Sequence, residues 1–574
     1  MHIMIFLLYV LYFRAVLNSG LSADDMWNYN IKASQYTGGP GAWELTWNQF
    51  FMWLNAGRLF PFSNYVYILF QFMPSITFYK ILIVLSTYLS NLLCGLSLKK
   101  ITGQRYFEYM YMLLFLLFIQ LTPEFDSALY CYHMLIQLVS IWCFLSLWLV
   151  FQYMDSKKKQ YMVLSVISYF MALGTYEVAY VFIFVILLGI GIRTKGWKTI
   201  IKMGTPHMVV TIAMGILNVY LRIHARTEAY DGITLNLHAK QVIITLIKQC
   251  FTCFPVGRYI RYGLQREQLY SHLYPYTVWE VIKSTRLLDI LTIILFAGIF
   301  VIIERRYWDN RKIQTGMLRT VIGMGLILFL LPGGLIAVSV KYQNMLGWCS
   351  GHLPAYMQSM GIAMVVLGIY EWIRQKHWKV TKIIRAGCLF IAIVILLLNQ
   401  ITGRISVEKM NQSRKYPQEC LEAAADAGMF DEVIDDSEKI VFGVTDYIYD
   451  ISSSRDFYSR YAKANIYAMP RQDVIGVMKN TGLSTDGYEM VDNRQQFYAT
   501  YSVANQEGGL VIIGKCCYVQ LDDQGMEFSH VWVEDPKIYV QGQVENSELI
   551  DGQQGIYQEK GVYDLIEIKN YYSD

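Results

Sequence analysis

Long apolar segments separated by short polar connections fill the first 402 residues of the chain. A helix that crosses a membrane needs about 20 predominantly apolar residues. The pattern predicts eleven such helices, at residues 1–17, 76–98, 106–121, 129–151, 160–174, 177–192, 205–222, 287–303, 318–338, 355–373 and 383–401. The first is short for a span, and a cleaved signal peptide is the alternative, although it lacks the basic start of one.

The composition supports this interpretation. Hydrophobic residues make up 54% of the 574 residues and charged residues only 16%, whereas soluble chains carry about 25% charged residues. Aromatic residues reach 15%, and Tyr and Trp are typical of membrane–water boundaries. The expected class is a polytopic α-helical membrane protein in a lipid bilayer, and no nucleic acid is expected as a partner.

Lys and Arg in the connections predict the orientation of the helices, because cytoplasmic loops are enriched in them. The connections at Thr122–Ala128 and Thr175–Glu177 contain neither residue type. The intervening connections are basic, at residues 99–105, 157–159, 193–202, 305–312 and 374–382. With about eleven spans in the cell membrane, the N-terminus is then cytoplasmic and the C-terminal part extracytoplasmic.

Charge divides the chain into two parts. The residues from Arg404 onward contain 29 acidic and 15 basic side chains, whereas the part before them contains 16 and 34. Residues 403–574 are predicted to form a soluble α+β domain, distinct from the transmembrane domain at 1–402. Its expected elements are a helix at Cys420–Phe430 and strands at Lys439–Val444, Gly509–Gly514, His530–Val533 and Lys537–Val544.

Two connections are long, residues 20–75 and 223–286, and both are expected outside. In the connection at 223–286, Lys240–Phe254 is apolar enough to resemble a span, but Lys240, Lys248 and Pro255 favour a helix on the surface.

In the connection at 20–75, Asp24 and Asp25 directly follow the first span. Carboxylates near a membrane are costly and are usually functional. They can act as a general base, hold a divalent cation such as Mg²⁺ or Mn²⁺, or cap a helix.

The order of these features resembles the GT-C superfamily of glycosyltransferases, in which a first span precedes an acidic pair and many further spans. More narrowly, Asp24-Asp25 followed by aromatic residues and Trp53–Pro61 (WLNAGRLFP) resembles the GtrII-like bacterial glucosyl transferases. The resemblance implies an inverting enzyme that moves a sugar, glucose in the named group, from a polyprenyl-phosphate carrier to a cell-surface glycan.

Such a donor needs cations near the outer rim to bind its phosphate. Arg58 is the first candidate, followed by Arg222, Arg226 and Lys341. Because a sugar phosphate already carries a good leaving group, one proton acceptor is sufficient. We assign Asp25 as this base, Asp24 as its helper or a metal contact, and Glu177 as a contact for the acceptor or a metal.

Simpler explanations exist for these residues. Each cation can be solvated or lipid-facing, and the aromatic residues of the first loop can form an interfacial belt. His133, His207 and His352 are expected to be interior or interfacial. Two other functions stay open. One is a non-catalytic envelope assembly protein, and the other is a flippase for lipid-linked glycans, which is disfavoured because the spans carry almost no charge.

Overall fold

The computed structural model describes residues 1–413 apart from nine short gaps, and beyond them the strands alone. The gaps are residues 35–38, 122–126, 195, 226–233, 255–258, 260–277, 308–312, 349–350 and 377–380. The chain divides into two compact units. The helical unit comprises Met1–Asp25, Thr46–Val66 and Met73–Glu408, and the second unit comprises Met26–Leu45, Tyr67–Phe72 and Lys409–Asp574.

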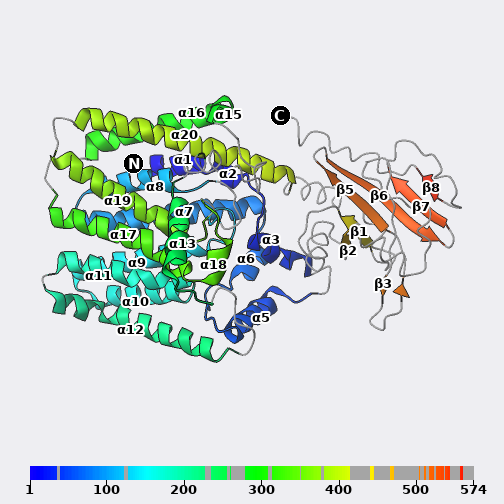
Figure 1. Cartoon of the computed structure of the whole chain (residues 1–574), viewed down its shortest axis with the longest axis horizontal. Coiled ribbons are helices and arrows are strands. Elements are labelled where there is room, and N and C mark those ends of the chain that lie inside the picture. The colour runs from blue at the N-terminus through cyan, green and yellow to red at the C-terminus, as the bar shows by residue number, and fades with distance from the viewer. Residues whose placement is uncertain are drawn as a thin grey trace. The chain divides into compact units, whose positions relative to one another are not determined.

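Helices make up almost all of the described chain up to Ser413 (Figure 1). They are α1 (His2–Tyr12), α2 (Arg14–Leu17), α3 (Asp24–Tyr29), η1 (Asn30–Ala33), α5 (Ala42–Asn55), α6 (Val66–Phe72), α7 (Ile76–Thr102), α8 (Arg105–Phe118), α9 (Leu135–Ser156), α10 (Lys159–Leu173), η2 (Glu177–Val181), α11 (Phe182–Arg193), α12 (Trp197–Ile223), α13 (Ala239–Phe251), α15 (Val278–Lys283), α16 (Leu287–Ile302), η5 (Ile303–Tyr307), α17 (Thr315–Ala337), α18 (Val340–Met345), α19 (Ala355–Lys376) and α20 (Thr381–Ser413).

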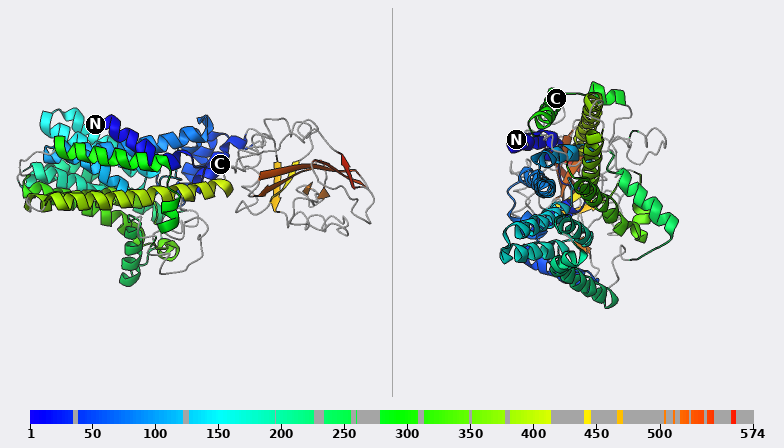
Figure 2. Two further views of the ribbon diagram at one scale, coloured as in Figure 1. Left: turned by 90° about the horizontal axis from the view of Figure 1, so that it is seen from above. Right: turned by 90° about the vertical axis from the view of Figure 1, so that its left-hand side faces the viewer.

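The long helices of the helical unit pack side by side, as Figures 1 and 2 show. The most extensive contact joins α17 to α19. At this crossing a Cβ on Gly361 would lie 2.5 Å from the backbone nitrogen of Phe329, and one on Gly325 would lie 2.7 Å from the carbonyl of Gly361. Small residues let membrane helices approach this closely, and packing then replaces the hydrophobic driving force that lipid does not supply.

Ion pairs show that the basic connections lie together at one end of the bundle, here called the basic end. Asp155 at the end of α9 binds Lys100 at the end of α7 (2.7 Å) and Arg193 at the end of α11 (2.6 Å). Near the end of α16, Glu304 binds Arg374 of α19 (3.0 Å) and Arg385 of α20 (3.6 Å). Helix ends beside the predicted basic connections therefore meet in ion pairs, whereas the orientation of the helices in the membrane stays a prediction.

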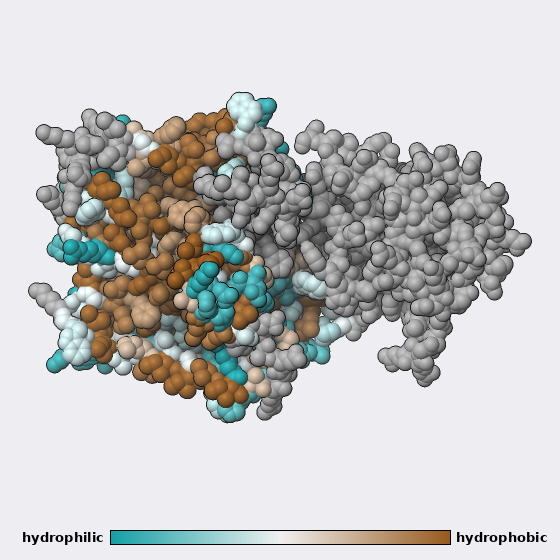
Figure 3. Space-filling view, viewed as in Figure 1, coloured by the Kyte–Doolittle hydropathy of each residue, from teal (hydrophilic) through white to brown (hydrophobic). Residues whose placement is uncertain are grey.

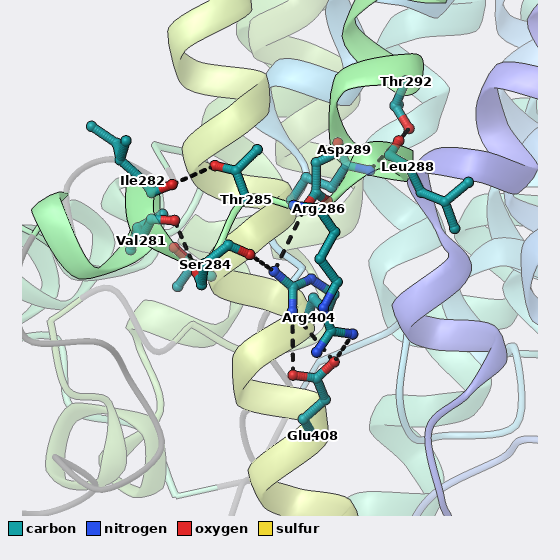
Figure 4. Close-up of polar contacts among 12 residues, drawn as sticks. Val281, Ile282, Ser284, Thr285, Arg286, Leu288, Asp289, Thr292, Arg404 and Glu408 are labelled. Atoms are coloured by element: carbon teal, nitrogen blue, oxygen red, sulfur yellow. Dashed lines mark hydrogen bonds and ion pairs between the residues drawn. The ribbon is translucent and has the colours of Figure 1, made fainter. Parts of the chain in front are cut away.

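A second polar cluster lies at the opposite end, where α2 ends, α16 begins and α20 continues (Figure 4). The buried carboxylate of Asp289 pairs with Arg14 and, at 3.5 Å, with Arg404. Glu408 on α20 bridges Arg404 (3.3 Å) and Arg286 (2.8 Å). This cluster fastens the last helix of the unit to α2 and to the start of α16.

Apolar side chains cover much of the outer surface of the helical unit (Figure 3). On α12, Val209, Ile212 and Ile216 are each more than half exposed. Six described helices are long and apolar enough to cross a membrane, at Ile76–Thr102, Leu135–Ser156, Trp197–Ile223, Leu287–Tyr307, Thr315–Ala337 and Arg385–Asn411. A soluble protein rarely exposes apolar surface on this scale. The chain is a multi-pass membrane protein.

Each of the eleven predicted spans coincides with a helical segment, although the count of eleven membrane crossings stays a prediction. The boundaries differ most at residues 129–134, which form a turn before α9, and at residues 177–181, which form the short η2. Helix α20 also continues past Thr402 into the part that charge assigned to the soluble domain. Helix α13 has 13 residues, fewer than a span needs.

The described elements of the C-terminal part are strands. They are β1 (Ile440–Val444), β2 (Ile466–Pro470), β3 (Val503–Ala504), β4 (Leu510–Val511), β5 (Cys516–Asp522), β6 (Gly525–Glu534), β7 (Lys537–Gly542) and β8 (Ile556–Glu559). Strands β5–β8 form one sheet in sequence order, and β1 pairs with β2 in parallel. Four predicted strands coincide with β1, β4, β6 and β7, whereas the predicted helix at Cys420–Phe430 lies outside the described residues.

Candidate functional site

The two adjacent carboxylates have different surroundings. Asp25 is completely buried, whereas Asp24, at the start of α3, is exposed. The Tyr79 hydroxyl donates a hydrogen bond to one oxygen of Asp25, and the backbone N–H of His133 donates to the other at 2.8 Å. The Lys80 ammonium lies near enough to stabilise the charge of Asp25. Asp25 is thus fixed between the start of α7 and the turn before α9.

The turn that binds Asp25 has a strained backbone. Tyr132, His133 and Met134 are consecutive non-glycine residues with φ of 66°, 36° and 62°, and Ala23, next to Asp24, has φ of 47°. L-residues rarely adopt positive φ, and each such residue costs on the order of 1–3 kcal/mol. Strain of this kind persists where the surroundings enforce it, and it is concentrated at functional sites. Here it lies in the two segments that meet at Asp25.

Burial controls the protonation of this cluster. It raises the pKa of Asp25 from 3.8 to about 7, against the opposing effects of the Lys80 charge and of the hydrogen bonds from Tyr79 and His133. The charge of Asp24 raises the pKa of Asp25 further. Burial also lowers the pKa of His133 to about 4, so that this imidazole is neutral at pH 7.

Three residues predicted to contact the substrate meet at a cavity of about 60 Å³. Glu177, the first residue of η2, binds Arg222 at the end of α12 through one oxygen (2.5 Å) and Arg58 through the other (3.6 Å). Because both arginines pair with the single carboxylate of Glu177, these three side chains together give the cavity one net positive charge. Its walls include Tyr176, Ser339 and Tyr342.

Local packing fixes Arg58 at this cavity. Its guanidinium lies over the rings of Trp53 (4.9 Å) and Phe60 (4.6 Å). Gly57, with φ of +80°, brings the loop so close to α12 that a Cβ would lie 2.9 Å from the Cα of Arg222. The WLNAGRLFP stretch therefore presents its arginine to the end of α12, which explains the need for glycine before it.

A row of aromatic rings joins the cavity to the acidic cluster. Tyr132, next to the His133 amide that binds Asp25, lies 6.2 Å from the ring of His352. His352 in turn lies 4.6 Å from the ring of Tyr342, which lines the cavity. The acidic cluster and the cavity both lie at the end of the bundle opposite the basic end. Helices α7 and α9, beside the acidic cluster, begin at that end, and α12, beside the cavity, ends there.

The remaining candidate residues, Lys341, Arg226 and the three histidines, lie outside the cavity or outside the described residues. Lys341 lies on α18 beside Tyr342 but does not line the described cavity. Arg226 lies outside the described residues. The three histidines are buried, as expected, with His207 bonded to the Ser165 hydroxyl at 2.8 Å.

Two of the candidate carboxylates for a divalent cation already bind protein groups, and a cation at Asp24 stays a prediction. Both oxygens of Asp25 accept hydrogen bonds, and Glu177 already binds two guanidinium groups. Within the described chain no group of three or more His, Cys, Asp or Glu side chains is placed to hold a metal ion.

Sequence reasoning missed Lys80 and Tyr79, which contact or face Asp25. A signal for Lys80 was present, because it is a lysine near the start of an otherwise apolar span. Its ammonium donates to the carbonyl of Tyr130 at 3.0 Å and is fully buried. Tyr79 and Tyr130 carry no such signal, since the chain has 44 tyrosines.

No protein-family model matches the chain, and no curated protein matches it. Among solved structures it is similar to ArnT from Cupriavidus metallidurans bound to undecaprenyl phosphate, at 12% identity over 81% of this chain and 85% of ArnT, with a TM-score of 0.32.

It is also similar to the Archaeoglobus fulgidus oligosaccharyltransferase in complex with zinc and sulfate, at 12% identity over 84% of this chain and a TM-score of 0.39. The archaeal oligosaccharyltransferase AglB from Archaeoglobus fulgidus, in complex with an inhibitory peptide and a dolichol-phosphate, gives 11% identity over 84% of this chain and a TM-score of 0.37. The chain spans 63% and 66% of these two structures. All of these TM-scores are below 0.5.

Proposed function

We propose that this protein is a GT-C-type membrane glycosyltransferase that moves a sugar from a polyprenyl-phosphate carrier to a surface glycan. The observation that supports this most strongly is where the candidate residues lie in the helix bundle. A carboxylate pair and a cavity with two arginines lie at the same end of a membrane helix bundle, opposite the basic connections. With the basic end in the cytoplasm, this end faces outward, where a carrier-borne sugar phosphate and a glycan can meet.

In the proposed reaction, different groups perform the separate steps. Arg58 and Arg222 neutralise the phosphate while the bond between its oxygen and the anomeric carbon breaks. The acceptor hydroxyl forms the new bond to that carbon and gives its proton to a carboxylate. Polyprenyl phosphate leaves with the electron pair of the broken bond. A phosphate leaving group needs no protonation, so one base is sufficient, and a single displacement inverts the anomeric centre.

Burial favours Asp24 over Asp25 as this base. A base must come within hydrogen-bond reach of the proton that it accepts. Asp24 is exposed, whereas the oxygens of Asp25 are occupied by Tyr79 and His133. The sequence had favoured the opposite assignment. We therefore assign Asp24 as the proton acceptor and Asp25 as the positioning residue that fixes the segment carrying it.

The decisive experiment compares the surface polysaccharide of cells that express the protein with that of cells that lack it. We expect one sugar substituent to be missing without the protein, and glucose is the sugar to test first because of the resemblance to glucosyl transferases. D24N should lower the transfer rate by about 10²–10⁴-fold, the range for loss of a general base, with unchanged abundance in the membrane.

D155N is the matched control, because Asp155 is a half-exposed carboxylate at the basic end that pairs with Lys100 and Arg193. Identical polysaccharides with and without the protein, or full activity in D24N, would contradict the proposed function.

A further inference from the structure

Glu177 occupies the position where a phosphate bound by Arg58 and Arg222 would place its oxygens. Its two carboxylate oxygens each face a different guanidinium group, at 3.6 Å and 2.5 Å. Guanidinium groups bind carboxylate and phosphate oxygens with the same donor geometry. In the structure, therefore, an acidic side chain of the protein itself fills the anion site.

Contacts other than the one with Glu177 hold Arg58 and the backbone of its loop in place. Arg58 is held between Trp53 and Phe60 and is only 10% exposed. The backbone N–H of Leu59 donates to the Asn218 side chain (3.3 Å) on α12, one turn before Arg222. The loop that carries Arg58 is thus attached to the helix that carries Arg222, so that both backbone segments stay together when Glu177 leaves.

Glu177 is free to leave in a way that Arg58 is not. Its side chain is 31% exposed, so water can solvate the carboxylate after it turns away. The cavity beside it has a volume of about 60 Å³. This volume holds several atoms of the size of a water oxygen, as many as one tetrahedral oxyanion contains.

We propose that Glu177 is an internal placeholder for the carrier phosphate: it neutralises the arginines in the empty protein and is displaced when a prenyl phosphate binds. This inference rests on the proposed function, since it assigns Arg58 and Arg222 to the phosphate. Removing a side chain that only contacts the substrate would weaken substrate binding, whereas removing a placeholder has the opposite effect. Removing the carboxylate should tighten phosphate binding, because the ligand no longer competes with it and meets two positive charges.

The test measures binding of farnesyl phosphate to the full-length protein in detergent micelles, with farnesol as the uncharged comparison. We expect E177Q to bind farnesyl phosphate about tenfold more tightly than the wild type, equivalent to about 1.4 kcal/mol, and farnesol binding to stay unchanged. R222Q should weaken farnesyl phosphate binding about tenfold or more. E408Q is the control, because Glu408 also bridges two arginines but lies outside the cavity.

The double variant R222Q/E177Q separates competition from a structural role and serves where E177Q is poorly folded. If Glu177 competes with the ligand, the double variant keeps one unopposed arginine and binds farnesyl phosphate more tightly than R222Q does. If Glu177 only supports the fold, the double variant binds less tightly than R222Q.

The two proposals fail in different ways. Equal or weaker binding to E177Q, with the double variant no better than R222Q, overturns the placeholder while the wild type still binds. If neither the wild type nor any variant prefers farnesyl phosphate to farnesol, both the placeholder and the phosphate site of the proposed function are wrong.

Discussion

The backbone N–H of His133 donates a 2.8 Å hydrogen bond to a carboxylate oxygen of Asp25, 108 residues earlier in the chain. This bond joins the segment after the first two helices to the start of α9. Because Asp25 satisfies an amide in a strained turn, its side chain is committed to the fold. Its neighbour Asp24 is thereby presented outward, which is why two adjacent acids can have different roles.

The raised pKa of Asp25 predicts how stability depends on pH. Its pKa is about 7 in the folded protein against 3.8 normally, so the folded state retains a proton that the unfolded state loses. Stability from this group is therefore greatest below pH 4 and falls as the pH rises toward 7. The lowered pKa of His133 acts in the opposite direction over much of this interval, so the Asp25 effect is seen in a comparison of variants. We expect the melting temperature of the wild type in detergent, relative to that of D25N, to decrease from pH 4 to 7.

D155N again provides the control, because Asp155 is a surface carboxylate with a lowered pKa. D155N, relative to D25N, should show the same decrease between pH 4 and 7 as the wild type does. The same pH dependence of the melting temperature in the wild type and in D25N would contradict the burial argument.

Gly57→Ala should damage the arginine cavity more than the fold. Alanine at φ of +80° is strained, and its Cβ would meet the Cα of Arg222 at 2.9 Å. Gly103→Ala is the matched control, because Gly103 has a similar φ of +74° but no atom within 4 Å of the added Cβ. Both variants should lose about 1 kcal/mol of stability from backbone strain, measured by thermal unfolding. Only Gly57→Ala should also lose farnesyl phosphate binding, and equal binding by the two variants would exclude this role of Gly57.

Asp289→Asn tests the cluster that fastens α20 to α16 (Figure 4). Asp289 is fully buried between Arg14 and Arg404, so the variant removes the carboxylate that pairs with Arg14 and leaves Arg404 paired with Glu408 alone. Removing one member of a buried pair costs about 3–5 kcal/mol. Glu408→Gln, at a carboxylate that is 35% exposed, should cost about 1 kcal/mol or less. Comparable losses of thermal stability in the two variants would show that burial does not control this cluster.

The sequence predicted the helical class, the positions of the helical segments and the residues Arg58, Arg222 and Glu177. Apolar segment length and the distribution of Lys and Arg are local properties, so they can be read without knowing which helices pack together. The cavity was not predictable, because Arg58, Glu177 and Arg222 come from three separate connections. Only the close approach at Gly57 brings them within ion-pair distance.

The separate roles of Asp24 and Asp25 could not be predicted from the sequence for a different reason. Asp24 and Asp25 are identical in type and adjacent, so nothing local distinguishes them. The distinction arises from Tyr79, Lys80 and His133, which the fold places around only one of them. In the same way, the pattern at residues 129–134 appears helical because it is apolar. Positive φ at three successive residues depends on the bond to Asp25 and therefore on tertiary structure.

The orientation of the bundle gives the last prediction. The structure places Asp24 and the loop at Lys158 at opposite ends of the helical unit, since Asp25 binds the turn before α9 and Lys158 follows the end of α9. Positively charged connections favour the cytoplasm. We therefore expect D24C to react with a membrane-impermeant maleimide in intact cells, and K158C to react only after permeabilisation. Both positions are exposed, so access to the reagent depends on the side of the membrane. The unmodified chain corrects for its own cysteines, and labelling of K158C before permeabilisation would show that the proposed site faces the cytoplasm and cannot act on a surface glycan.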